Sequence, residues 1–165
     1  MKTHAVRRGA CLAASLLILA VVLSASAAES FTGVKAKAIT GDATAQCSLG
    51  VMYYLGNGVP KDAAEAVKWW HQAAGQGNAE AQYLLGLRYA EGDGVPKNSP
   101  EAVKWSRRAA EQGHLQAQQF LGRMYYCGDG VRKDDAEALK WWREGAERGN
   151  AEAQYLLGLR FADGN

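Results

Sequence analysis

The chain has 165 residues, 48% of them hydrophobic and 22% charged, with a formal net charge of +2. This length indicates one small domain. Three of its 19 basic residues, Lys2, Arg7 and Arg8, stand in the first 28 residues, so the remainder has 16 basic against 17 acidic residues, a net charge of −1. No basic surface is left to condense onto phosphates, which excludes nucleic acid as an expected partner.

The first 28 residues have the pattern of a secretory signal peptide. A basic start precedes an unbroken run of apolar and small residues over 10–23, and small residues at 25–27 match an A-x-A cleavage site. A run of about 14 residues is short for a membrane span, which needs about 20. We expect a periplasmic or secreted protein, with an uncleaved N-terminal anchor as the alternative. Membrane contact is expected only through such a leader.

From residue 42 onward the chain repeats with a period of 36 residues. The repeats span 42–77, 78–113 and 114–149, a partial fourth covers 150–165, and residues 29–41 form a partial N-terminal repeat or cap. A fixed period of this length predicts stacked units that are each too small to bury an apolar face alone.

Each repeat is predicted to be a pair of antiparallel helices. In the second repeat, apolar residues recur at helical spacing through 79–89, and Gly92 ends this first helix, helix A. A tight loop with Gly94 follows, and the second helix, helix B, begins near Asn98 and ends at Gly113. The sequence therefore predicts an all-α solenoid of helix hairpins.

The predicted core positions recur in the same register. A glycine in the middle of helix A costs about 1 kcal/mol relative to alanine, so we expect helix B to approach closely there. We expect the tryptophan of helix B to fill the space beside this glycine. The predicted core residues are Leu49, Gly50, Tyr53, Trp69, Leu85, Gly86, Tyr89, Trp105, Leu121, Gly122, Tyr125, Trp141, Leu157, Gly158 and Phe161.

No residue is a candidate for catalysis, cofactor binding or metal binding. Cys47 and Cys127 lie in first helices two repeats apart, roughly 20 Å or more, whereas a disulfide needs Cα atoms within about 7 Å. His71 occupies a position that is basic in the other repeats and is expected to be solvated, and His114 takes a helix-capping position. Neither has companions at metal-ligand spacing.

These residues resemble the Sel-1-like repeat family, a relative of the tetratricopeptide repeat. Its pattern A-x-x-x-L-G-x-x-Y, G-x-G-V, A-x-x-W-x-x-x-A-A-x-x-G is present over 45–77, 81–113 and 117–149, with Gly145 replacing one alanine, and begins again at residue 153. The resemblance implies a right-handed superhelix of helix hairpins that binds a protein or peptide as an adaptor or regulator in the cell envelope. Some cysteine-rich members are credited with β-lactam binding or hydrolysis. This chain lacks their cysteine pairs and an S-x-x-K motif, so a cell-wall or β-lactam-related enzyme is the weaker alternative.

Alternate repeats are more alike than adjacent ones. Residues 78–88 and 150–160 are identical, and Tyr54 and Trp70 of the first repeat match Tyr126 and Trp142 of the third. Aromatic residues are frequent at protein interfaces, so these four are the candidate partner-binding residues, with packing between neighbouring helices as the alternative. Because the fourth repeat lacks helix B, we expect either a terminal cap or self-association through the C-terminal end, as in a self-assembling module.

Overall fold

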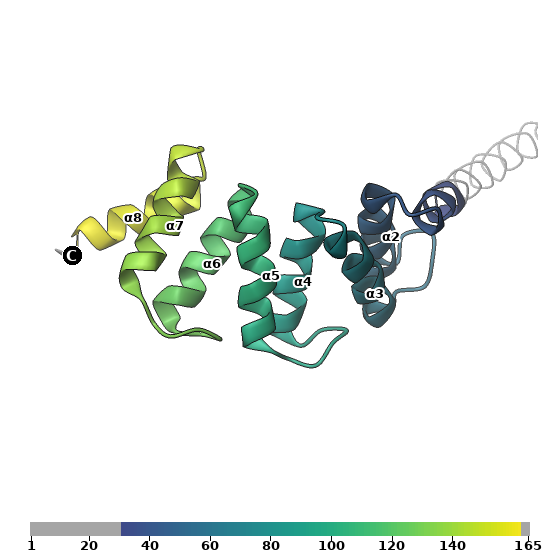
Figure 1. Cartoon of the computed structure of the whole chain (residues 1–165), viewed down its shortest axis with the longest axis horizontal. Coiled ribbons are helices and arrows are strands. Elements are labelled where there is room, and N and C mark those ends of the chain that lie inside the picture. The colour runs from purple at the N-terminus through teal and green to yellow at the C-terminus, as the bar shows by residue number, and fades with distance from the viewer. Residues whose placement is uncertain (1–30, 163–165) are drawn as a thin grey trace, which may run out of the picture.

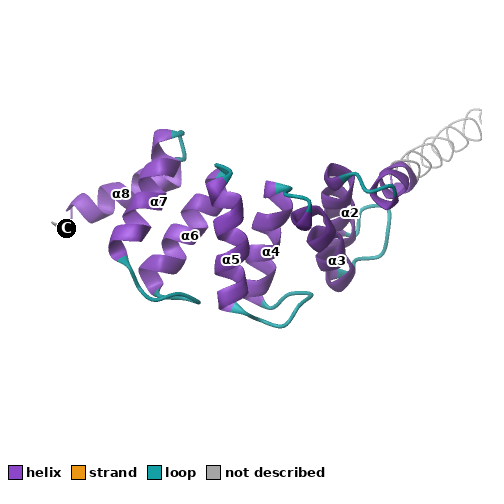
Figure 2. Cartoon of the chain, in the orientation of Figure 1, coloured by secondary structure: helices purple, strands orange, loops and turns teal. Residues whose placement is uncertain are grey.

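The computed structural model describes residues 31–162, and the predicted all-α solenoid is confirmed (Figure 1). Helical residues 31–39 are followed by α2 (Ala43–Leu55), α3 (Ala63–Gly75), α4 (Ala79–Glu91), α5 (Ser99–Glu111), α6 (Leu115–Cys127), α7 (Asp135–Glu147) and α8 (Ala151–Ala162). No residue in this range lies in a strand (Figure 2). The predicted signal peptide over 1–28 lies outside the described residues.

The helices pack in chain order. Helices α2 and α3, α4 and α5, and α6 and α7 form three hairpins, and each hairpin packs on the next through its second helix. Figure 1 shows the hairpins following one another along the long axis of the molecule. None of the helices between residues 31 and 162 is long and apolar enough to cross a membrane.

The first helices of the three hairpins begin and end in the same way. The first helix of each hairpin begins after a side-chain cap that accepts a backbone N–H three residues on, and ends at a glycine in the left-handed conformation. At these glycines φ lies at 78°, 79° and 74°, where other residues are strained. The caps are Asp42, Asn78 and His114, and the glycines are Gly56, Gly92 and Gly128.

The mid-helix glycines mark the contact between the two helices of a hairpin. A Cβ atom on Gly50 would lie 2.5 Å from Nε1 of Trp70, inside any allowed contact. The equivalent Cβ atoms would meet Ser106 at Gly86 and Trp142 at Gly122. The predicted close approach is therefore confirmed in all three hairpins.

The prediction that Trp69, Trp105 and Trp141 fill this space is wrong. A helix turns by about 100° per residue, so the next position, 70, 106 or 142, faces the glycine instead. Trp69 packs against the small cluster formed by the N-terminal helical residues and α2, and Trp105 meets His71 edge-on with ring centroids 5.6 Å apart. Trp69 and Trp105 therefore join successive repeats, whereas residues 70, 106 and 142 lie within hairpins.

The interior consists of three apolar clusters rather than one continuous core. In chain order, these clusters contain Leu49, Leu85 and Leu121. Tyr53 packs against the first and second clusters, and Tyr89 packs against the second and third. The predicted core residues Leu49, Leu85 and Leu121 are fully buried. Two half-buried tyrosines therefore connect the cores of adjacent repeats.

The core predictions for the fourth repeat hold only in part. Leu157 is half-buried, but Gly158 is exposed, and apart from its chain neighbours and the backbone of its own helix no described atom lies within 4 Å of where its Cβ would be. The side chain of Phe161 lies outside the described residues.

A glutamine at one register ties each first helix to the preceding repeat. Gln46, Gln82 and Gln118 donate from Nε2 to the carbonyls of Ala38, Ala74 and Ala110 at 3.1, 3.1 and 3.2 Å. The Oε1 atoms of Gln46 and Gln82 accept at 2.7 Å from Gln76 and Gln112. Arg148 stands at that donor's register in the third repeat, and the buried Oε1 of Gln118 has no hydrogen-bond partner among the described residues.

Candidate partner-binding site

Two of the four predicted partner-binding residues are buried. Trp70 is 1% exposed and Trp142 is 2% exposed, and their indole N–H groups donate within the hairpin, to Cys47 O at 3.2 Å and to Gln119 O at 3.3 Å. The prediction that they present a surface to a partner is wrong, because each ring fills the space opposite a mid-helix glycine.

The two predicted tyrosines are half-buried and lean on these tryptophans. The ring of Tyr54 lies 5.7 Å from that of Trp70, and the ring of Tyr126 lies 5.7 Å from that of Trp142. The hydroxyl of Tyr54 accepts a hydrogen bond from Arg88 on α4. Tyr54 thus packs between neighbouring helices, as the alternative interpretation states, and it closes the groove between α2 and α4.

Arg88, which the sequence did not single out, holds the Tyr54 side chain in place. It is 7% exposed, lies 4.6 Å above the Tyr54 ring, and pairs with Asp93 at 3.0 Å and Glu91 at 2.9 Å. The signal in the sequence is an arginine at a register that holds methionine in the two adjacent repeats, at positions 52 and 124. A buried cation is stable only with such partners.

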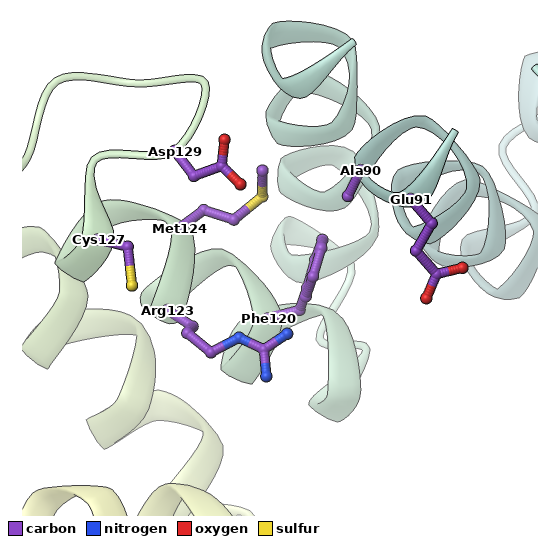
Figure 3. A pocket seen from close by; sticks show the side chains of 7 residues that line it. All are labelled: Ala90, Glu91, Phe120, Arg123, Met124, Cys127 and Asp129. Carbon is purple, nitrogen blue, oxygen red and sulfur yellow. The ribbon is translucent and has the colours of Figure 1, made fainter. Parts of the chain in front are cut away.

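The next groove, between α4 and α6, contains a pocket of about 240 Å³ (Figure 3). Figure 3 shows Ala90 and Glu91 on α4 across from Phe120 and Met124 on α6. Met124 is buried and Phe120 is half-buried, so they give the pocket an apolar floor. The remaining lining residues, Arg123, Cys127 and Asp129, are exposed.

The pocket edge is charged and carries a thiol. Glu91 and Asp129 are acidic, and the guanidinium of Arg123 lies 5.4 Å from the Phe120 ring. Cys127 is a free, exposed cysteine at this edge, whereas Cys47 is free and buried, and burial raises the pKa of its thiol to about 11. This arrangement can hold an apolar side chain at its floor and polar groups at its edge.

The histidines lie between repeats. The prediction that His71 is solvated is wrong: it is half-buried, its Nε2 lies 2.9 Å from the hydroxyl of Tyr89, and burial lowers its pKa. His114 is a helix cap as predicted, because its Nδ1 accepts from Ala117 N at 3.3 Å while its Nε2 lies 2.8 Å from Glu80. Among residues 31–162, no three potential ligands cluster to hold a metal ion.

Comparison with known proteins places this helix pattern in one family. The family described as Sel1 repeat matches residues 43–78, 79–114, 115–150 and 151–165. No curated protein matches the chain significantly.

Solved structures give the same result. A protective antigen of uropathogenic Escherichia coli with an SLR fold is 45% identical, with a TM-score of 0.79 over 81% of this chain and 29% of that one. A Sel1 repeat protein from Oxalobacter formigenes is 38% identical, with a TM-score of 0.80 over 91% of this chain and 60% of that one. Helicobacter pylori cysteine-rich protein B is 23% identical, with a TM-score of 0.61 over 77% of this chain and 96% of that one, and shares the fold. The chain thus spans less than two thirds of the length of the first two proteins.

Proposed function

The chain belongs to the Sel1 repeat family, whose members are helical scaffolds that generally bind other proteins, and on this premise we propose that it is an exported interaction scaffold of the cell envelope. Its binding surface is the side on which α4 and α6 face each other. The partner is a protein or peptide segment that lies along these helices.

The pocket between α4 and α6 is the observation that carries this proposal. Its volume of about 240 Å³ is below the range of about 300–1,000 Å³ that is usual for small-molecule sites. It suits a single side chain of a larger ligand. The exposed charged groups at its edge are positioned to contact the partner segment that carries such a side chain. They are Glu91, Arg123 and Asp129.

Export is supported by the residues at the start of the chain. The basic start, the apolar run over 10–23 and the small residues at 25–27 match a cleaved leader. The test is cell fractionation with N-terminal sequencing of the purified protein. A mature chain that begins near residue 28 in the periplasm or medium supports export, and an intact Met1 in the cytoplasm contradicts it.

A matched pair of arginine variants tests the proposed surface. Arg123 on α6 and Arg108 on α5 are both exposed, and both lie over an aromatic ring, at 5.4 Å from Phe120 and 4.7 Å from Trp105. Peptides are first selected on the immobilised full chain from a random displayed library, and their affinities for Arg123→Glu and Arg108→Glu are then compared. We expect Arg123→Glu to weaken binding about tenfold and Arg108→Glu to leave it unchanged. Equal effects, or a library that yields no binder, would contradict the proposed function.

A further inference from the structure

Three residues that line the pocket between α4 and α6 have counterparts, one repeat earlier, that fill the equivalent space between α2 and α4. The first groove, between α2 and α4, and the second groove, between α4 and α6, are related by the 36-residue period. Ala90 corresponds to Tyr54, Met124 corresponds to Arg88, and Asp129 corresponds to Asp93.

In the first groove these registers form a filled site. The Tyr54 ring occupies the space between α2 and α4, Arg88 donates to its hydroxyl, and Asp93 holds the guanidinium at 3.0 Å. Two cations contact the half-buried ring, because Lys61 lies 5.3 Å and Arg88 lies 4.6 Å from its centroid.

In the second groove the ring is missing because the register holds Ala90. The pocket of about 240 Å³ lies at the place that the Tyr54 ring fills in the first groove. The third repeat restores the tyrosine as Tyr126, so alternate repeats place one open site between two tyrosine-bearing registers.

We propose that this pocket receives an aromatic side chain of the partner, with tyrosine preferred, in the place of the missing ring. The proposal rests on the proposed function and specifies the chemistry of the segment that binds. The floor suits an aromatic ring, because the thioether of Met124 and the ring of Phe120 both make favourable contacts with aromatic groups.

The preference for tyrosine comes from Asp129. At the register of Arg88 the second groove has Met124, so the arginine that pairs with Asp93 in the first groove has no counterpart at this register beside Asp129. A phenol hydroxyl entering the pocket can donate directly to this carboxylate, and hydrogen bonds to an ionised acceptor are the stronger kind. Phenylalanine fills the same volume without this bond.

The experiment uses amino-acid amides as probes and a variant that fills the pocket. The full chain is titrated with N-acetyltyrosinamide, N-acetylphenylalaninamide and N-acetylleucinamide while the backbone amide signals are followed by NMR. We expect the signals of Ala90, Phe120 and Met124 to move with the tyrosine probe, less with the phenylalanine probe, and at about tenfold higher concentration with the leucine probe.

Ala90→Tyr copies a residue that the chain already carries at this register in α2 and α6, so its fold should be kept, which circular dichroism checks. We expect this variant to abolish the pocket response. Asp129→Asn, on an exposed loop, should remove the advantage of the tyrosine probe over the phenylalanine probe, and it keeps the test available if Ala90→Tyr does not fold. The absence of any response at the pocket, or a response that both variants leave unchanged, would overturn the proposal.

The peptides selected on the chain separate this proposal from the proposed function. Peptides that need Arg123 but bind Ala90→Tyr as tightly as the unaltered chain would overturn the aromatic pocket and leave the scaffold function standing. Loss of their binding by at least about tenfold in Ala90→Tyr supports the pocket. A chain that binds no peptide overturns the scaffold function, and the probe titration then decides the pocket by itself.

Discussion

Replacing Gly50 by alanine should destabilise the protein even though alanine is the better helix former. The Cβ atom would lie 2.5 Å from Nε1 and 2.6 Å from Cδ1 of Trp70. Because the Trp70 side chain is 1% exposed, the indole cannot turn into solvent to make room. Either the ring moves within a packed hairpin or α2 and α3 separate.

The magnitude follows from three opposing effects. Alanine gains about 1 kcal/mol in helix propensity over glycine. Overpacking a buried site costs about 1–3 kcal/mol, and displacing Nε1 from Cys47 O, now at 3.2 Å, costs about 1 kcal/mol more. We therefore expect the free energy of unfolding to fall by about 1–3 kcal/mol.

The assay is urea unfolding followed by circular dichroism and tryptophan fluorescence, with Gly158→Ala as the control. Gly158 has the same register in α8, but it is exposed, and apart from its chain neighbours and its own helix backbone nothing in the described part of the chain lies within 4 Å of its Cβ position. The control should gain up to about 1 kcal/mol from helix propensity alone. A Gly50→Ala variant as stable as the unaltered protein, or an equal loss in both variants, would refute this account of the hairpin contact.

Three further predictions concern buried groups. Arg148→Gln should add about 1 kcal/mol to the free energy of unfolding in urea, because the new amide can donate to the unpartnered Oε1 of Gln118; no gain would contradict this. Burial lowers the pKa of His71 below its ordinary 6.5, so folding favours the neutral imidazole. The free energy of unfolding should therefore decline as pH falls below about 6.5. His71→Gln should lack this part of the decline when both proteins are measured across about pH 4–8. Iodoacetamide at about pH 8 should modify Cys127 and spare Cys47 until urea is added, because Cys47 is buried and its thiol pKa is about 11; mass spectrometry that finds both modified in the native protein would contradict the structure.

The helix hairpins could be predicted from the sequence because their ends depend on local chemistry. Glycines such as Gly56 and Gly92 take a backbone conformation that other residues avoid, and side-chain caps such as Asp62 accept hydrogen bonds three residues along the chain. These interactions involve only neighbouring residues. Residue type and spacing therefore suffice to place them.

Which tryptophan of α3 faces the mid-helix glycine could not be predicted in the same way. Trp69 and Trp70 are adjacent aromatics, and both satisfy a pattern of apolar spacing. Which of them meets Gly50 depends on how α3 rotates against α2, and that rotation is set by the packing of whole helices. The sequence therefore predicted Trp69, which recurs in every complete repeat, instead of its neighbour Trp70.

The pocket escaped prediction because it depends on a side chain that is small. Ala90 fits a helix pattern and draws no attention until it is compared with Tyr54 and Tyr126 at the same register. Its effect also depends on Met124, which lies on the neighbouring helix α6. Met124 stands at the register that Arg88 has in α4. Comparing registers across repeats, rather than searching for motifs, is the way to find such a site.

The most direct test of the account is to map a selected peptide on the chain by NMR. Amide signals of the full chain are recorded with and without a saturating peptide from the displayed library. The account predicts that the shifts lie in α4, α6 and the loop that carries Asp129, while the exposed residues of α5 and α7 keep their signals. Shifts confined to α3, α5 and α7 would contradict the claim that the first helices of the hairpins form the binding surface.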